Sequence, residues 1–394
     1  MDGRTVIRER YLQKLMNLVA DSRIKVIYGP SYVGRTTILK QLKSELLKSG
    51  VTEESMATVS FDRGFNLAES PEAYMHLLNS VCKSEKRFLL IDSADLSPGY
   101  SEVLCSFRRK RPDVNIFVTV CSNSLMITGT PLWEITDSAV GVQIYPFTFR
   151  EYLKLFPGDR NRALSDFMAV GGIPVMYNEL SADNLQVMSQ CYTHLILNSL
   201  IMRESKINPV AMGELLFYIV ANMNRPLTMK ELIENSSIVD NRTLEKYLDR
   251  FVSSKILYRC DGYQADRGMK PSAKSVFFPI DTLSGQLFTS KGVQSARSVT
   301  ILYNIVFIEL MVRGYEPEVL IAKGEVLGLF INVDGTDTLI RVAESLDLDR
   351  PSGTFSAYRS AVMKKMLLTL DVPRQDYNRF NQRNISEFLL SDEI

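Results

Sequence analysis

The stretch Gly29–Thr37, which reads Gly-Pro-Ser-Tyr-Val-Gly-Arg-Thr-Thr, decides the fold. It fits the pattern G-x-x-x-x-G-K-[ST], except that Arg35 stands where a lysine is expected. In this pattern the glycines let backbone N–H groups turn toward phosphate oxygens, and the helix after Gly34 directs its positive end at them. The Thr36 hydroxyl can ligate Mg²⁺. The stretch predicts a phosphate-binding loop; the alternative is a strand–helix turn without a ligand.

Short apolar runs alternate with longer amphipathic runs on both sides of this loop. A strand is predicted before the loop, and a helix, Thr37–Leu47, is predicted after it. Strands that alternate with helices indicate a parallel sheet, in which ligands lie at the carboxyl ends of the strands. The predicted strands are Lys25–Tyr28, Ala57–Phe61, Phe88–Ile91, Ile116–Val120 and Val142–Tyr145.

The third of these strands supplies the second half of a nucleotide site. Phe88–Ile91 is followed by Asp92, an acid that can hold the water shell of a metal ion. In hydrolytic P-loop enzymes a glutamate follows and activates the attacking water. Here Ser93 follows, and a serine cannot take that proton. Asp95 is the remaining candidate base, although it would have to reach back. Asp92 and Asp95 are therefore the predicted catalytic residues.

After Pro146 the pattern becomes mainly helical. Three predicted helices followed by two strand-like runs with a polar loop between them form the winged-helix pattern. The last ~100 residues mix helix and strand patterns, which is typical of a further α/β domain. The predicted helices are Phe149–Phe156, Ala163–Val170, Leu185–Ser205, Ala211–Met223, Met229–Asn235, Arg242–Ser253, Leu302–Arg313 and about Phe355–Leu368; the predicted strands are Ile256–Tyr258, Ser275–Phe278, Leu329–Val333 and Thr338–Val342.

Composition narrows the class of protein. The chain has 394 residues, enough for two or three domains, and its 45% hydrophobic and 23% charged residues are typical of a globular protein. The formal net charge of +1 gives no general attraction to nucleic acid or anionic membranes. The five cysteines form no C-x-x-C pair, so neither zinc nor a redox motif is indicated. With no signal-peptide pattern and no membrane span, a cytoplasmic protein is expected.

The chain contains, in order, the segments YGPSYVGRTT (28–37), FLLIDSAD (88–95), VCSNS (120–124), IYPFTFREYL (144–153), GGIPVMY (171–177), TLEKYLDRFVSSKIL (243–257), FFPID (277–281) and NIVFIELMVRGYEPEV (304–319). With these segments in this order, the chain resembles archaeal and bacterial AAA-type ATPases that carry a winged helix and a C-terminal domain of unknown function. That domain is similar to a decayed PD-(D/E)XK nuclease. The resemblance covers nearly the whole chain and depends on the order and spacing of its segments.

The resemblance implies ATP and Mg²⁺ as cofactors. It places Asp92 at the position of the Mg²⁺-associated acid, so Thr36 and Asp92 are the expected metal-associated residues. It also places Ser122 or Asn123 where the family has a polar residue that senses the γ-phosphate. The expected nucleotide-binding residues are Gly29, Pro30, Ser31, Tyr32, Val33, Gly34, Arg35, Thr36, Thr37 and Asn123.

Three departures from the family concern phosphate-handling positions. The loop lysine is Arg35, the catalytic glutamate is Ser93, and a Gly-Arg pair of the family reads Ala139-Val140. Arginine keeps the charge of lysine but is bulkier and planar. Loss of a cation at 139–140 would remove a stabiliser of phosphoryl-transfer charge. These departures predict that fast hydrolysis is lost.

The predicted helix Arg242–Ser253 would be the recognition helix if the winged helix bound DNA. Its cations recur at four-residue spacing and share one face, but acidic residues are interspersed with them, which suits an exposed face with helix salt bridges. A structural or protein-contact role is the main interpretation, and DNA binding stays open. The cations are Arg242, Lys246 and Arg250, and the acids are Asp240, Glu245 and Asp249.

The C-terminal domain is not expected to be an active nuclease. The resemblance aligns Glu309 with the first acid of the nuclease motif, and Glu325-Val326-Leu327 with a Glu-Ile-Asp, so Leu327 replaces a metal-binding aspartate. Arg341-Val342-Ala343 replaces the usual glutamine-led segment. A leucine cannot ligate a metal ion, and Glu309 is expected to be a salt-bridged helix residue.

The architecture expected from the sequence has four parts. They are a parallel α/β P-loop domain of AAA type (1–155), a helical connecting region (156–205), a winged helix (206–285) and a degenerate nuclease-like α/β domain (286–394). The leading hypothesis is an ATP-binding protein with slow or no hydrolysis that acts as a nucleotide-dependent switch or scaffold. One alternative is an active ATPase that uses Arg35 and Asp95, and another is a nucleotide-free scaffold for DNA or protein. A protein partner stays open, a membrane partner is not expected, and the oligomeric state is not predicted.

Overall fold

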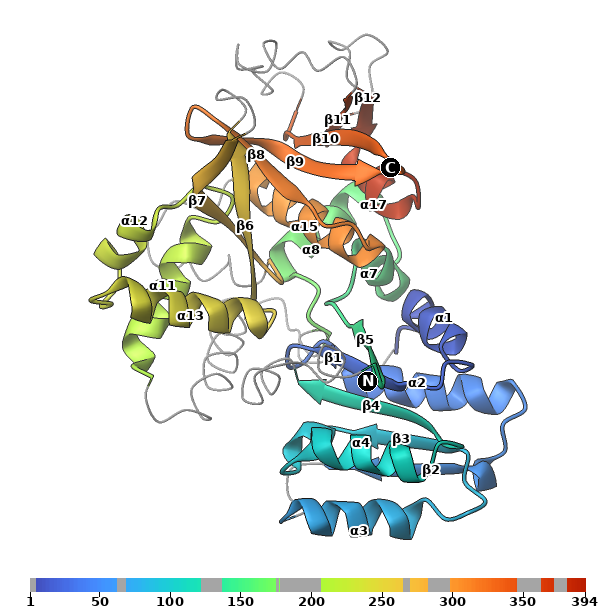
Figure 1. Cartoon of the computed structure of the whole chain (residues 1–394). Coiled ribbons are helices and arrows are strands. Elements are labelled where there is room, and N and C mark those ends of the chain that lie inside the picture. The colour runs from blue at the N-terminus through green and yellow to red at the C-terminus, as the bar shows by residue number, and fades with distance from the viewer. Residues whose placement is uncertain are drawn as a thin grey trace. The chain divides into compact units, whose positions relative to one another are not determined.

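The computed structural model (Figure 1) describes residues 5–61, 69–121, 137–174, 177, 207–264, 270–282, 298–345, 363–371 and 381–394. The chain forms two compact units. The first comprises Met1–Tyr145 with Ser253–Lys255, and the second comprises Pro146–Val252 with Ile256–Ile394. Among the described helices, none has the length and apolar character needed to cross a membrane.

The first unit contains a five-stranded sheet in the order β2–β3–β4–β1–β5, and every neighbouring pair is parallel. Parallel order places the carboxyl ends of all five strands at one edge. The predicted phosphate loop begins at this edge, where β1 ends at Gly29. The strands are β1 (Ile24–Gly29), β2 (Met56–Ser60), β3 (Phe88–Asp92), β4 (Asn115–Cys121) and β5 (Ala139–Gln143).

Helices cover this sheet because each has one apolar stripe. On α2, the residues Ile38, Leu39, Leu42 and Leu46 recur at three- and four-residue spacing and are buried. Helices α3 and α4 contact each other and share an apolar core with one face of the sheet (Figure 1). Ser70 begins α3 by accepting the Ala73 N–H. The helices are α1 (Glu9–Asn17), α2 (Arg35–Lys48), α3 (Pro71–Val81) and α4 (Tyr100–Lys110), with 3₁₀ turns η1 (Glu53–Ser55) and η2 (Ala94–Leu96).

A buried lysine lies at the amino end of β1, opposite the phosphate loop. Lys25 is 0% exposed, and its ammonium group donates to the Asp21 carbonyl and to Oδ1 of Asn115. The same group lies 5.1 Å from the centre of the Phe117 ring. Burial lowers the pKa of Lys25 to about 8, although the negative charge of Asp21 opposes the shift. The protein tolerates this cation because its donors have partners.

The described residues of the second unit up to 282 form helices and a hairpin. Helix α7 starts with a capping box in which Thr148 and Glu151 each satisfy a backbone N–H of the other residue. Helix α12 repeats this device with Thr228 and Glu231. The elements up to the hairpin are α7 (Phe149–Leu155), α8 (Arg160–Val170), α11 (Pro209–Ala221), α12 (Met229–Glu234), α13 (Asn241–Ser253), β6 (Leu257–Gln264) and β7 (Lys270–Pro279).

Among the described residues, the remainder of the second unit adds one long helix, five strands and a short terminal helix. Together with the hairpin, the strands form a mixed sheet in the order β12–β11–β10–β9–β8–β6–β7. Strand β6 pairs parallel with β8 at Tyr263–Leu320 and Gln264–Ile321, so this sheet runs across the predicted boundary at residue 285. The elements are α15 (Ser298–Arg313), β8 (Glu318–Ala322), β9 (Glu325–Val333), β10 (Thr336–Val342), β11 (Lys364–Thr369), β12 (Asn381–Asn384) and α17 (Ile385–Leu390).

Two helix predictions differ in outcome from the rest. The helix at Leu185–Ser205 falls outside the described residues. The helix at about Phe355–Leu368 is wrong from Lys364 onward, because β11 occupies Lys364–Thr369 and pairs parallel with β10 and β12. The apolar run Met366–Leu368 is too short for its periodicity to separate a buried strand from a helix. The pairing with β10 and β12 decides the outcome.

Candidate functional site

The predicted phosphate loop lies between β1 and α2. Gly29 closes β1, residues 30–34 form the loop, and Arg35 opens the helix. Gly34 has a φ of 92° and Tyr32 a φ of 70°, so two residues of the loop adopt the left-handed conformation. Among the described residues, no side chain caps the start of α2. The first backbone N–H groups of this helix are therefore available to an anionic ligand.

The backbone of the loop packs closely against Ile144 and Arg8. A Cβ atom on Gly29 would lie 2.5 Å from the Ile144 carbonyl oxygen, so only glycine fits where β1 ends. The Val33 carbonyl accepts a hydrogen bond from Nη1 of Arg8 at 3.1 Å, and the same atom donates to the Tyr145 carbonyl at 2.9 Å. Arg8 is 2% exposed. It fixes the loop through the backbone, a role that sequence reasoning missed.

The expected metal-associated residues meet at the carboxyl edge of the sheet. Thr36 Oγ1 lies 3.1 and 2.9 Å from the two carboxylate oxygens of Asp92. Asp92 ends β3 and is 9% exposed, whereas Thr36 is exposed. A hydroxyl and a carboxylate at this separation are the oxygen donors that Mg²⁺ takes from a protein, with water and phosphate completing its shell. The residues present therefore fit a Mg²⁺–nucleotide complex.

Thr119 is a further member of this cluster. Its hydroxyl, on β4, donates to Oδ1 of Asp92 at 2.5 Å and accepts the Ser93 N–H at 2.7 Å. Thr119 is fully buried. The first hydrogen bond holds the Asp92 side chain in place, and the second fixes the backbone that follows it. Thr119 belongs to no sequence motif. Its position near the end of β4, the strand that pairs with β3, was the only local sign that it could lie near Asp92.

Ser93 and Asp95 lie just beyond Asp92. Ser93 has a φ of 56°, the left-handed conformation, which is uncommon for a residue other than glycine. The chain then enters η2, where Asp95 is half-buried. Burial, and then the negative charge of Asp95, raise the pKa of Tyr74, which lies on α3. The charge of Asp95 therefore affects the pKa of Tyr74. That Asp95 serves as the catalytic base stays a prediction. Asn123 and Ser122 lie outside the described residues.

The residues aligned with the nuclease motif lie in the second unit and do not form a metal site. Glu309 is 5% exposed and accepts a hydrogen bond from Nε of Arg313 at 2.8 Å, which is the salt-bridged helix role expected for it. Leu327 is buried on β9 in an apolar cluster with Leu320 and Leu339. Within the described ranges, no three His, Cys, Asp or Glu side chains gather where they could hold a metal ion.

The cations of α13 have the mixed environment that their sequence suggested. Arg242 and Lys246 are exposed, and Arg250 is half-buried. On the same helix, Glu245 forms an ion pair with Arg259 of β6 at 2.8 Å. The helix therefore carries at least one charge pair that a bare phosphate-binding surface would not need.

Comparisons with known proteins agree with the site in the first unit. A family model described as an AAA domain matches residues 21–153. An uncharacterized protein of Haemophilus influenzae is 25% identical over 336 residues, which cover 81% of this chain and 82% of the relative. An uncharacterized protein of Methanocaldococcus jannaschii is 22% identical over 296 residues, which cover 65% of this chain and 60% of the relative.

The chain is also similar, over part of its length, to solved structures. A Walker-type ATPase of Pyrococcus abyssi has a TM-score of 0.48 and 14% identity, with 71% of this chain and 95% of that chain covered. The replication initiator DnaA bound to AMPPCP and single-stranded DNA has a TM-score of 0.33 and 14% identity, with 63% and 87% covered. Residues 21–153 thus combine a match to a model described as an AAA domain with a parallel sheet and a loop of the P-loop type.

Proposed function

We propose that this protein binds ATP with Mg²⁺ at the loop between β1 and α2. The observation that carries the proposal is the contact between the Thr36 hydroxyl and the Asp92 carboxylate beside the uncapped start of α2. Bound Mg²⁺ would neutralise phosphate charge there. Thr36 and Asp92 would hold the ion and its water, and the N–H groups of the loop and helix would hold the phosphates. Arg35 would supply a cation to the terminal phosphates.

We further propose that hydrolysis is slow or absent. Ser93 occupies the position after Asp92, and its hydroxyl is too weak a base to activate water at neutral pH. Its backbone N–H is bound to Thr119, which fixes the residue in the left-handed conformation. Ala139 and Val140, on β5, offer no cation to the transferred phosphoryl group. These features favour retention of nucleotide over turnover.

In this proposal the binding of nucleotide, rather than its hydrolysis, changes the state of the protein. ATP occupancy would change how the P-loop domain packs against the winged helix and the degenerate nuclease-like domain, and a protein partner would sense that change. An active ATPase that uses Asp95, and a nucleotide-free scaffold, are the competing functions. Small-angle scattering of the apo and ATP–Mg²⁺ states tests the switch, and identical curves would contradict it.

Calorimetric titration with ATP and Mg²⁺ tests the nucleotide site itself. We expect saturable binding to the wild type, and at least a tenfold weaker affinity, about 1.4 kcal/mol, for Arg35→Ala, because a cation next to the phosphates is lost. Lys40→Ala is the matched control, since Lys40 is an exposed cation on the same helix.

The result for the wild type decides between the functions. Absence of ATP and GTP binding would leave the scaffold as the remaining function. Binding together with steady phosphate release, reduced in Asp95→Ala, would instead establish the active ATPase.

A further inference from the structure

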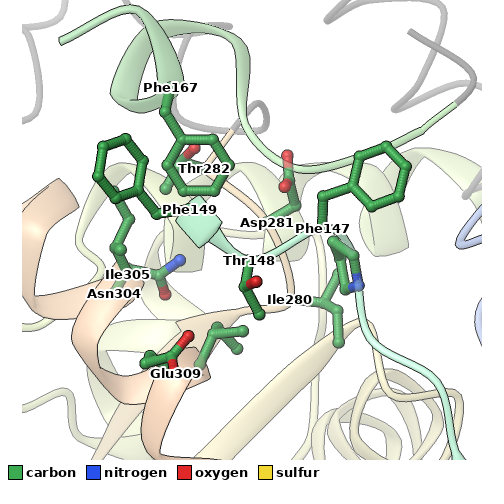
Figure 2. Close-up of a pocket in the computed structure, with 12 residues that line it drawn as sticks. Phe147, Thr148, Phe149, Phe167, Ile280, Asp281, Thr282, Asn304, Ile305 and Glu309 are labelled. Atoms are coloured by element: carbon green, nitrogen blue, oxygen red, sulfur yellow. The ribbon is translucent and has the colours of Figure 1, made fainter. Parts of the chain in front are cut away.

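A small cavity lies within the second unit, away from the residues assigned to nucleotide. Four stretches of the chain line it: the start of α7, the side of α8, the residues that follow β7, and one face of α15 (Figure 2). Three of these stretches belong to the segments PFTF, FFPID and NIVFIEL, for which the proposed nucleotide site gives no role. The cavity has a volume of about 30 Å³.

Two buried side chains in the cavity wall have unmade hydrogen bonds. Asn304 is 1% exposed, and neither its carboxamide oxygen nor its nitrogen has a partner in the described part of the chain. Thr282 is 3% exposed, and its hydroxyl is likewise unpartnered there. Figure 2 shows the Asn304 carboxamide directed toward the Thr148 side of the cavity. A buried polar group without a partner costs about 1–3 kcal/mol, so an occupant is expected.

The other polar groups of the wall already make bonds. Thr148 accepts the Glu151 N–H at the start of α7. Asp281 accepts the Gly172 N–H at 2.5 Å, and Glu309 accepts from Arg313. The unmade bonds thus concentrate on one carboxamide and one hydroxyl. Together these two groups offer both donors and acceptors, and neither carries a charge.

This chemistry selects the occupant. A metal ion would use the carboxamide oxygen and leave the nitrogen unpaired. An apolar molecule would leave every bond unmade, and an organic ligand of ordinary size needs a pocket of about 300 Å³ or more. Water both donates and accepts, and a site of about 15 Å³ holds one molecule, so the cavity has room for one or two.

We propose that one or two ordered water molecules occupy this cavity and hydrogen-bond the Asn304 carboxamide and the Thr282 hydroxyl. The waters join α15 to the end of the β6–β7 hairpin, beside the residues that open α7. Pro146, the first of the residues that line the cavity, directly follows Tyr145 of the first unit in the sequence. The site is a hydrated joint that fixes residues 146–149 against the other elements of the second unit that line the cavity.

A crystal structure at a resolution that shows ordered water tests the proposal directly. We expect a density peak within hydrogen-bonding distance, about 2.7–3.2 Å, of the Asn304 carboxamide. An empty cavity, or density that fits a metal ion or an organic molecule, would overturn it.

Asn304→Leu provides an independent test in solution, because leucine has a similar volume and removes both the amide and its need for water. If water satisfies Asn304 in the wild type, the melting temperature should change by less than about 2 °C, since the lost bonds and the lost desolvation nearly cancel. A rise of about 5 °C or more would indicate a dry cavity with unmade bonds and would contradict the proposal. Val306→Ala, at a buried position of the same helix that does not line the cavity, measures the effect of a packing change alone.

Discussion

The phosphate loop and the hydrated joint treat buried polar groups in opposite ways. Around the loop, Arg8, Asp92 and Thr119 are satisfied by other protein groups, at distances between 2.5 and 3.1 Å. Around the joint, Asn304 and Thr282 have no such partners among the residues that the structure describes. A network closed by protein atoms is rigid before any ligand arrives, which suits a site that must present backbone N–H groups to phosphate. A network completed by solvent holds its elements together only when the water molecules are in place.

The largest expected effect concerns a glycine beside the joint. Gly171 has a φ of 77°, and a Cβ atom there would overlap the Asp281 carboxylate. We expect Gly171→Ala to lower the free energy of unfolding by about 3 kcal/mol or more, because the backbone is strained and the contact between Asp281 and Gly172 is lost. Urea denaturation measures the effect. Gly158→Ala is the control, since nothing lies within 4 Å of its added Cβ; equal losses in the two variants would contradict the prediction.

The second effect concerns Lys25, the buried lysine of the first unit. The pKa of Lys25 is about 8 in the folded protein and about 10.4 in the unfolded chain, so the folded state holds fewer protons between these values. Stability should therefore rise with pH from about 8 to 10.4, and the cost of the buried charge should be fully present below pH 8. We expect wild type to gain about 2 kcal/mol relative to Lys25→Met between pH 7.5 and 10.

Urea unfolding of the two proteins at both pH values measures this difference, because titrations common to both cancel. A constant difference across the range would show that Lys25 keeps an ordinary pKa in the folded state. That result would also weaken the view that protein groups, rather than water, satisfy the buried polar groups of the first unit, since the Lys25 ammonium would then be solvated.

The smallest effect concerns Thr119. Thr119→Val keeps the shape of the side chain and removes the hydroxyl that binds Asp92 and the Ser93 N–H. We expect the affinity for ATP with Mg²⁺ to fall about tenfold, or about 1.4 kcal/mol, while the smaller affinity without Mg²⁺ changes less. Calorimetry in magnesium and in EDTA measures both. Thr58→Val makes the same change at an exposed position of β2; a matching loss there would remove Thr119 from the site.

Local patterns predicted the parts of this molecule that depend on local chemistry. The five strands of the first sheet are short apolar runs, and the helix after the loop is amphipathic. The contact between Thr36 and Asp92 joins two local motifs, one that follows β1 and one that ends β3. Arg8 and Thr119 carry no motif, because their roles arise from contacts with residues 25 and 27 positions away. Strand β11 was mistaken for helix for the same reason, since its neighbours in the sheet determine its conformation.

The parallel pairing of β6 with β8 has a consequence for how this chain can be divided. A cut near residue 285 would separate the hairpin from the strands that follow and leave β6 on one fragment and β8 on the other, each with unpaired backbone N–H and C=O groups. Exposed strand edges of this kind recruit other chains. Fragments made there should aggregate. A cut at residue 145 instead keeps β6 and β8 on one fragment, and it separates from the first unit only Ser253–Lys255.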